Sequence, residues 1–299
     1  MAVSDAAVLH PPLRPRRRFR RISAGDLGFL ASAVILGVMT LLAIWPGLVT
    51  SHDPTLQSLI DRHRPLGYTD DAGVTYPLGT DHLGRDVWSR LVYGARASLT
   101  IGYAGLSLGA GAGVLIGLLA GFHGGTVDRI IVGVIDTYLS FPYILIAIVW
   151  AALVGTTLLT LVLIVAVRGW VDFARVVRAQ VLSIREREYV TAARGLGAGD
   201  IRILLRHVLP NTVGPILVIA GFQLGRLILL EATLSFLGLG IQPPTPAWGS
   251  MLADARLYMT HAWWTVAFPS IAISLTVLST NFLGDSLRDR LDPTLRRRI

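Results

Sequence analysis

The chain has 299 residues, of which 53% are hydrophobic and 15% charged, and its mean hydropathy is +0.59. A soluble domain carries about 25% charged residues. The composition, together with several apolar runs of 18 or more residues, therefore excludes an ordinary soluble protein and indicates a polytopic membrane protein. We attribute the net charge of +8 to basic inner loops rather than to nucleic-acid binding.

All 27 basic residues are arginines, and there is no cysteine. Without cysteine the chain has no disulfide, no thiolate metal ligand and no cysteine nucleophile. A Walker A loop needs a lysine on the nucleotide phosphates, and neither this lysine nor the pattern GxxxxGK[ST] is present. If ATP drives the activity of this protein, we expect another chain to bind it.

The N-terminal part of the chain is expected to form a tail, a membrane anchor and a loop. Residues 1–25 include PPLRPRRRFRR and have no apolar period, which predicts a disordered basic cytoplasmic tail. Residues 26–49 are apolar and long enough to span a bilayer. A cleaved signal peptide is the alternative, but the run is long for a signal core and lacks a good A-x-A site. Residues 50–96 are polar and are expected to form an extracytoplasmic loop.

Five further spans are expected in the core region, 97–284, which gives six transmembrane helices in total. They lie at about 97–121, 128–152, 156–172, 212–238 and 265–284. The first of these five has glycines at a spacing of four, which lets a second helix approach closely, so we expect close packing within the bundle. These glycines are Gly105, Gly109, Gly113, Gly117 and Gly121.

Arginine placement predicts the orientation. With both termini in the cytoplasm, including the tail 285–299, the inner segments hold 20 arginines and the outer segments 6. The inner segments are then 1–26, 122–129, 168–210 and 285–299. Five tryptophans are expected near the outer membrane interface, as in an aromatic belt. They are Trp45, Trp150, Trp248, Trp263 and Trp264.

The inner segment at about 185–211 combines arginines with helical patterning. A helix is expected at about 185–194, followed by a flexible turn that contains three glycines. A second helix has one apolar face, with apolar residues at i, i+3, i+4 and i+7. Asp200 is expected to cap this helix and Pro210 to end it. The residues alone fit a protein-docking segment and a lipid-facing helix equally well. The glycines are Gly195, Gly197 and Gly199, and the apolar face is Ile201, Leu204, Leu205 and Val208.

The same segment resembles the EAA loop of ABC-importer permeases. Its pattern is E-A-A, three residues, G, nine residues and I-x-L-P, and the matching residues are Ala192, Ala193, Gly197, Leu209 and Pro210. Thr191 stands where glutamate is usual, and His207 where isoleucine is usual. In that family the loop docks on the ATPase subunit. The resemblance therefore implies ATPase coupling through these five residues together with Gly195 and Asp200.

Three other stretches narrow the resemblance. GTDHLGRDVWSRLVYGARASL (79–99), SFLGLGIQPPTPAWGSML (235–252) and DSLRDRLDP (285–293) are similar to signatures of dipeptide, oligopeptide and nickel importer permeases, specifically the second permease of the pair. The resemblance implies an all-α, type I importer permease fold in the inner membrane. It also implies a second, homologous permease, two ATPase subunits that carry ATP and Mg, and an extracytoplasmic substrate-binding protein.

Two outer stretches contain candidate contacts. In GTDHLGRD, Asp81, Arg85 and Asp86 are expected to lie close together, either as a salt-bridged corner or in contact with a binding protein. Trp248 follows the stiff turn PPTPAW and begins an expected interfacial helix. The family resemblance places an outer scoop here, beneath the binding protein. The four residues are therefore candidates for facing that protein.

Ionisable residues within the expected spans are candidates for the translocation path, because an unpaired charge there is costly. They are Asp136, Arg226 and Glu231. Arg226 is expected either to pair with Asp136 across helices or to face the path and meet a peptide carboxylate. The histidines have no ligand spacing, so no metal site is expected, and the absence of HExxH gives no sign of metal-dependent hydrolase chemistry.

Together these features predict a permease subunit, without an ATPase site of its own, that imports dipeptides or short oligopeptides. A nickel or metal-chelate importer permease would share the same motifs. A secondary transporter is the alternative of a different class, and it predicts inverted repeats with broken helices. We see no clear repeat in this sequence.

Overall fold

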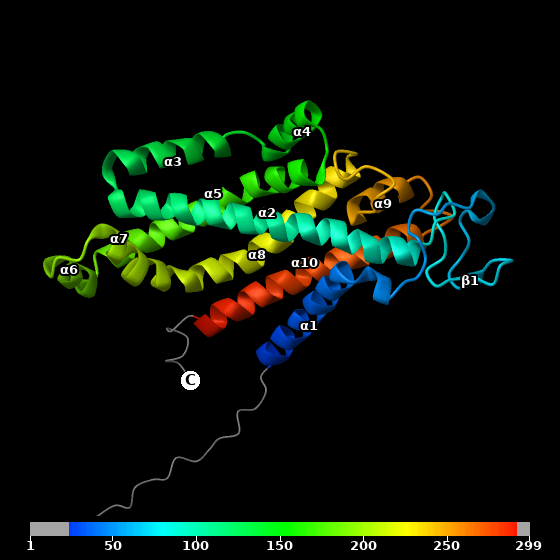
Figure 1. Cartoon of the computed structure of the whole chain (residues 1–299), viewed down its shortest axis with the longest axis horizontal. Coiled ribbons are helices and arrows are strands. Elements are labelled where there is room, and N and C mark those ends of the chain that lie inside the picture. The colour runs from blue at the N-terminus through cyan, green and yellow to red at the C-terminus, as the bar shows by residue number, and fades with distance from the viewer. Residues whose placement is uncertain (1–23, 292–299) are drawn as a thin grey trace, which may run out of the picture.

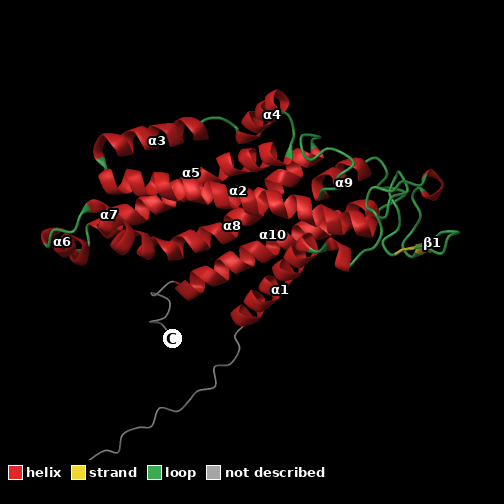
Figure 2. Ribbon diagram, in the orientation of Figure 1, coloured by secondary structure: helices red, strands yellow, loops and turns green. Residues whose placement is uncertain are grey.

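The computed structural model describes residues 24–291, and it is mostly helical, with loops concentrated at one end (Figures 1 and 2). The expected disordered tail therefore lies almost wholly outside the described residues, as do residues 292–299. In chain order the helices are α1 (Ala24–Ile44), η1 (Pro46–Leu48), η2 (Leu59–Asp61), α2 (Val87–His123), α3 (Gly125–Leu139), α4 (Tyr143–Val154), α5 (Leu158–Arg185), α6 (Glu188–Gly195), α7 (Asp200–Ile203), the π-helical turn η3 (Leu204–Val208), α8 (Leu209–Phe236), α9 (Trp248–Ala255) and α10 (Trp264–Leu291).

Six passages run along the long axis of the molecule in alternating directions, namely α1, α2, α3, α5, α8 and α10, and α4 turns away from α3 before the chain enters α5 (Figure 1). We call the end that carries residues 45–86 the outer end and the end that carries α6 and α7 the inner end, after their expected sides. Toward the inner end, the start of α1 and the end of α10 are joined by Arg290 Nη2 and Asp26 Oδ1, 3.0 Å apart.

Only some of these passages are apolar enough to count as spans on composition. Among the described residues, four helices qualify, and a fifth span results if α3 and α4 count as one. α5 does not qualify, because every 18-residue stretch of it contains the three charged residues Arg168, Asp172 and Arg175. The fold is therefore compatible with the expected six-helix arrangement, but its count of six apolar spans is not reproduced helix by helix.

The expected spans 97–121 and 128–152 differ from the observed helices. α2 begins at Val87, ten residues before the expected start, because Asp86 caps it by accepting hydrogen bonds from the backbone N–H groups of Trp88 and Ser89. The expected single span at 128–152 is bent by 83° between α3 and α4. Pro142 is the N-cap of α4 at this break, and the residue before a proline is disfavoured in helical conformation.

The outer end is a polar cap of short elements. β1 (Tyr68–Thr69) pairs antiparallel with β2 (Thr75–Tyr76). The turn between them is held by the Asp70 carboxylate, which accepts hydrogen bonds from the backbone N–H groups of Ala72 and Val74. Such an Asx-type turn needs no burial, so this small hairpin can stand on the surface of the membrane part.

The glycine stripe of α2 packs directly on α5, as the spacing of four predicted. A Cβ placed on Gly109 would lie 2.8 Å from the Ala166 carbonyl oxygen, and one on Gly117 would lie 2.6 Å from the Ala174 carbonyl oxygen. The two backbones are in contact along this seam, so only glycine fits there. The α2–α5 pair is consequently the rigid centre of the fold.

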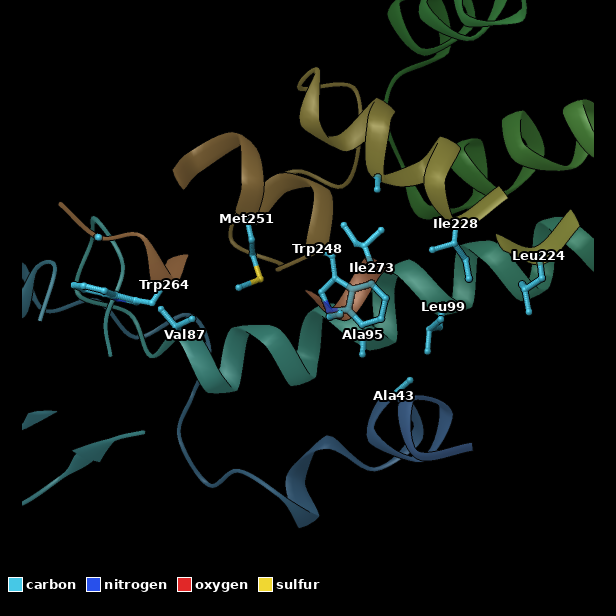
Figure 3. Close-up of a cluster of buried hydrophobic side chains, with 13 residues drawn as sticks. Ala43, Val87, Ala95, Leu99, Leu224, Ile228, Trp248, Met251, Trp264 and Ile273 are labelled. Atoms are coloured by element: carbon cyan, nitrogen blue, oxygen red, sulfur yellow. The ribbon is translucent and has the colours of Figure 1, made fainter. Parts of the chain in front are cut away.

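The main hydrophobic cluster lies toward the outer end, between α1, α2, α8, α9 and α10 (Figure 3). Trp248 and Trp264 belong to it, and the Trp248 indole Nε1 donates to the Leu91 carbonyl oxygen at 3.0 Å. These two tryptophans are therefore core residues, and their expected place in an aromatic belt is wrong. Trp45 and Trp263 are exposed, as a belt requires.

Candidate functional site

The inner end is formed by a helix–turn–helix, as expected. α6 and the helix that begins with α7 are anchored by Val190, Ile203 and Val208, which are fully buried against the inner ends of α2 and α5. Gly197 in the turn between them has φ +83, a conformation that suits glycine. The anchors fix the segment to the bundle, while the turn itself projects beyond it (Figure 1).

Apolar side chains on the outward side of this segment are not covered by any of residues 24–291. Leu196 is 90% exposed, Ile201 75% and Leu205 56%. The single apolar face expected from Ile201 to Val208 is therefore wrong, because Val208 is buried while Ile201 and Leu205 point outward. The wide π turn of η3 changes the rotation per residue, so the spacing of an ordinary α-helix does not apply across it. We call Leu196, Ile201 and Leu205, with the partly exposed Tyr189, the coupling patch.

Neither expected helix signal in this segment acts as predicted. Pro210 does not end the helix: α7, η3 and α8 form one continuous helix over Asp200–Phe236. A proline lacks the N–H donor and crowds the carbonyl four residues earlier, and the wider π turn just before it relieves this conflict. Asp200 makes no capping hydrogen bond, and Gly199 is the N-cap. Asp200 instead places a negative charge in the first turn, where the helix dipole favours it.

At the outer end, Asp81 and Arg85 form the salt-bridged corner that was one of the two expectations. Arg85 Nε lies 2.7 Å from Asp81 Oδ2, and Arg90 Nε lies 3.4 Å from the same oxygen. Both guanidinium groups also reach Asp254 Oδ2 on α9, at 3.3 and 3.6 Å. Two buried arginines and two carboxylates therefore clamp the outer loop and the start of α2 to α9. Charges removed from water in this way need such pairing.

The same geometry argues against direct contact between these residues and a binding protein. The side chains of Arg85 and Asp86 are buried within this chain, and Trp248 is only 1% exposed. Asp86 is occupied as the cap of α2, and its carboxylate also accepts from the Ser89 hydroxyl at 2.5 Å. Asp81 is buried as well. The expectation that these four residues contact a binding protein is therefore wrong. They lie beneath the outer surface and stabilise its shape.

Two histidines complete this outer corner. His82 stacks on Tyr258 with ring centroids 5.5 Å apart, and His63 packs against the same ring at 4.7 Å. Burial lowers the pKa of both imidazoles below the usual range, and for His82 it outweighs the attraction of Asp81 and Asp254. Both rings are therefore neutral at pH 7 and behave as packing groups.

Of the three expected path residues, Glu231 is fully buried in α8 and does not face a path. Its Oε1 accepts a hydrogen bond from the Ser235 hydroxyl at 2.6 Å. Its Oε2 has no hydrogen-bond partner among residues 24–291. Glu231 lies where α9 packs on α8, since a Cβ on Gly249 would collide with the backbone of Ala232 one residue further on.

Asp136 and Arg226 are both exposed on this chain, and within the described part of the chain they form no ion pair with each other or with another residue. The expected Asp136–Arg226 pair is therefore absent from the described part. Arg226 instead lines an open groove of about 320 Å³ between α5 and α8, together with Arg168 and Gln223. The apolar and hydroxyl residues of this groove are Leu227, Leu229, Leu230 and Thr233.

A short polar network organises one side of this groove. Arg168 Nη1 lies 3.2 Å from Asp172 Oδ2, and Gln223 Nε2 donates to the same oxygen at 2.6 Å. Sequence reasoning missed Arg168, because the fourth span was expected to end at 172 and Arg168 was counted as part of the inner segment. The structure continues α5 to Arg185, so Arg168 lies in the upper half of this passage. Charged residues at i and i+4 on one helix face were the available signal.

Residues 113–297 match the family described as "Binding-protein-dependent transport system inner membrane component". The chain belongs to this family. It is accordingly a multi-pass component of an inner-membrane ABC import system, and the binding protein and the ATPase of such a system are separate partners. The chain is a transport component and not itself an enzyme.

The similar proteins with curated names cover nearly the whole chain. The di/tripeptide transport system permease protein DppC of Pseudomonas aeruginosa is 39% identical over 98% of this chain and 96% of its own length. The dipeptide transport system permease protein DppC of Haemophilus influenzae is 35% identical over 99% and 100%. The glutathione transport system permease protein GsiD of Pectobacterium atrosepticum is 39% identical over 98% and 95%.

Proposed function

We propose that this chain is one of two homologous membrane subunits of an ATP-driven importer of dipeptides or short oligopeptides. Support for the cargo comes from relatives whose names specify dipeptides or di- and tripeptides. The single observation that carries the coupling role is the coupling patch: exposed apolar side chains at the inner end, on a segment with EAA spacing. An apolar surface of this kind is typical of a protein interface.

An ATPase subunit that docks on this patch would act directly on the bundle. The helix that begins at Asp200 continues without a break to Phe236, so a displacement of α7 moves α8. α5 is joined to α3 through Arg178 Nη2 and Asp128 Oδ2, 2.7 Å apart, and Arg185 Nη1 donates to the Gly121 carbonyl oxygen at 2.9 Å. The ATP and Mg would be held by the two ATPase subunits, and their closure would rock these helices to alternate access.

The proposed orientation has both termini in the cytoplasm, as the 20-to-6 distribution of arginines favours. The substrate-binding protein then docks on the outer cap, residues 45–86. The second permease covers the side of the bundle where α5 and α8 expose Arg168 and Arg226, because such charges are not stable against lipid. The translocation path lies between the two permeases at this side.

The coupling role is tested with Ile201→Asp in the complete complex. We expect insertion of the chain to be unchanged and co-purification of the ATPase subunits to be reduced, since a carboxylate would be desolvated in the interface. Ile60→Asp is the matched control: Ile60 is 85% exposed, but it lies at the outer end. Equal ATPase recovery with both variants would contradict the docking of ATPase on the coupling patch.

The cargo is tested separately, by uptake into proteoliposomes that contain the complex and its binding protein. Labelled dipeptide, tripeptide, glutathione and Ni²⁺ are offered in parallel. We expect ATP-dependent uptake of dipeptide. Uptake of glutathione in preference to dipeptide would make glutathione the cargo, as in the name of the relative from Pectobacterium atrosepticum. Uptake of Ni²⁺ alone would refute a peptide importer.

A further inference from the structure

The groove between α5 and α8 has an excess of positive charge. It contains the guanidinium groups of Arg168 and Arg226, and the carboxylate of Asp172 pairs with Arg168. Asp172 is already engaged, since it accepts from both Arg168 and Gln223. Arg226 has no ion-pair partner within the described part of the chain. One guanidinium group is thus held in place by this chain, and the second is free to bind an anion.

The groove lies deep in the membrane. Arg168 is ten residues from the outer start of α5, and Arg226 is ten residues from the outer end of α8. At 1.5 Å per residue, each lies about 15 Å from the outer end of its helix. The hydrocarbon core is about 30 Å thick, so both guanidinium groups lie near its midplane. An unpaired arginine at this depth is unfavourable against lipid, so this face meets water or protein.

The side chains around Arg168 are arranged to keep it facing the groove. The Tyr143 ring at the start of α4 lies 5.9 Å from its guanidinium carbon. The Tyr143 hydroxyl donates to the Ile164 carbonyl oxygen, and the Tyr138 hydroxyl donates to the Val167 carbonyl oxygen at 2.9 Å. These two hydrogen bonds join the bend between α3 and α4 to α5 within about one helical turn of Arg168, and the bend covers that side of the arginine.

We propose that Arg226, supported by Arg168, binds the carboxylate of the cargo during its passage through the membrane. This inference rests on the proposed function, because it requires a cargo with a carboxylate. A guanidinium group presents a planar pair of donors that matches a carboxylate, and such charge-assisted hydrogen bonds are among the strong ones. Leu227, Leu229 and Leu230 provide apolar surface beside the charges, which suits a peptide side chain of any apolar type.

The groove is open on this chain and would be completed by the second permease. A carboxylate on that permease, paired with Arg226, is the competing explanation for the free guanidinium group. This alternative predicts a structural role for Arg226, and it is an outcome of the experiment below.

The experiment uses the full complex with its binding protein in proteoliposomes and compares Arg226→Gln and Arg226→Lys with the control Arg129→Gln, which removes the same charge from an exposed position on α3 outside the groove. Two cargoes are offered: a labelled dipeptide, and the same dipeptide amidated at its C-terminus at a concentration that saturates the binding protein. Removal of a hydrogen bond to a charged group lowers an equilibrium constant by about 10-fold or more. We expect a loss of that order in dipeptide uptake with Arg226→Gln, partial retention with Arg226→Lys, and little change in uptake of the amide.

Three controls separate the explanations. ATP hydrolysis stimulated by the loaded binding protein should be unchanged in Arg226→Gln, because the coupling patch is intact. Loss of the second permease from the purified Arg226→Gln complex would assign Arg226 to the subunit interface and overturn the proposal. Equal losses for the dipeptide and its amide would also overturn it. If the wild-type complex transports neither peptide, the proposed function has failed, which is a different result from a failure of this site.

Discussion

The α2–α5 seam allows a sharp test of how the bundle is held together. Gly117→Ala would place a Cβ 2.6 Å from the Ala174 carbonyl oxygen and 2.9 Å from the Val177 Cβ. Both obstacles belong to the body of α5, so the two helices would have to separate by about 0.4 Å or more, with loss of packing along the whole stripe. Overpacking of this kind costs about 1–3 kcal/mol.

A second glycine on the same helix supplies the control. A Cβ added at Gly111 would have no atom within 4 Å, so Gly111→Ala meets open space. Both substitutions gain the same helix propensity, about 0.8–1 kcal/mol. The difference in unfolding free energy between the two variants therefore isolates the seam, and we expect Gly117→Ala to be less stable than Gly111→Ala by about 1–3 kcal/mol.

The assay is denaturant or thermal unfolding of the purified complex in detergent, followed by helical circular dichroism. Gly117→Val should extend the loss, since a larger side chain needs a larger separation of α2 and α5. If Gly117→Ala and Gly111→Ala unfold at the same denaturant concentration, the two backbones are not in contact at this position, and the reasoning about the glycine stripe is refuted.

Two further predictions concern the outer end. Burial lowers the pKa of His82 and His63, so protonation of these rings favours the unfolded state of the outer cap. The contribution of the two neutral rings to the stability of the cap should be fully present above the usual histidine pKa of about 6.5 and should decrease as the pH falls below this value. Hydrogen exchange of residues 45–86, measured between pH 7.5 and 5, checks this expectation. His82→Gln should weaken the pH dependence of exchange, whereas His123→Gln, at an exposed histidine, should not. An identical pH profile for both variants would contradict the role of His82. Trp248→Ala should destabilise the fold by about 3–5 kcal/mol, because it empties a fully buried site, and should therefore lower the yield of folded chain rather than impair cargo delivery alone. A normal yield of folded chain combined with a specific defect in cargo delivery would contradict the burial of Trp248 and indicate a role at the surface.

Features with a strong periodic signal could be predicted from the sequence. The spacing of four in the glycines of α2 was sufficient to predict a tight helix pair, and the glycines near Gly197 were sufficient to predict the turn of the coupling segment. Both signals are local, since each depends only on the geometry of one helix or one turn. The all-helical class followed from composition in the same way.

Features that depend on contacts between distant segments could not be predicted. The hydropathy pattern ended the fourth span at 172 because Arg168 and Asp172 lower the hydropathy there, whereas their mutual ion pair lets α5 continue to Arg185. Arg90 is likewise acceptable within α2 because Asp81 and Asp254 neutralise it. The burial of Trp248 results from the packing of α9 on α2 and α8, and no periodicity in an eight-residue helix indicates which face is covered.

The central claim is that ATP hydrolysis on partner subunits drives peptide import through this chain by way of the coupling patch. The most direct measurement is uptake of a labelled dipeptide by sealed proteoliposomes that contain the complete complex and its binding protein, with the wild-type chain or with Gly197→Val. Valine is strained at the positive φ of this turn, yet no atom of the described part of the chain lies within 4 Å of the added Cβ. The account predicts ATP-dependent uptake with the wild type and its loss with Gly197→Val, whereas full uptake with the variant would contradict it.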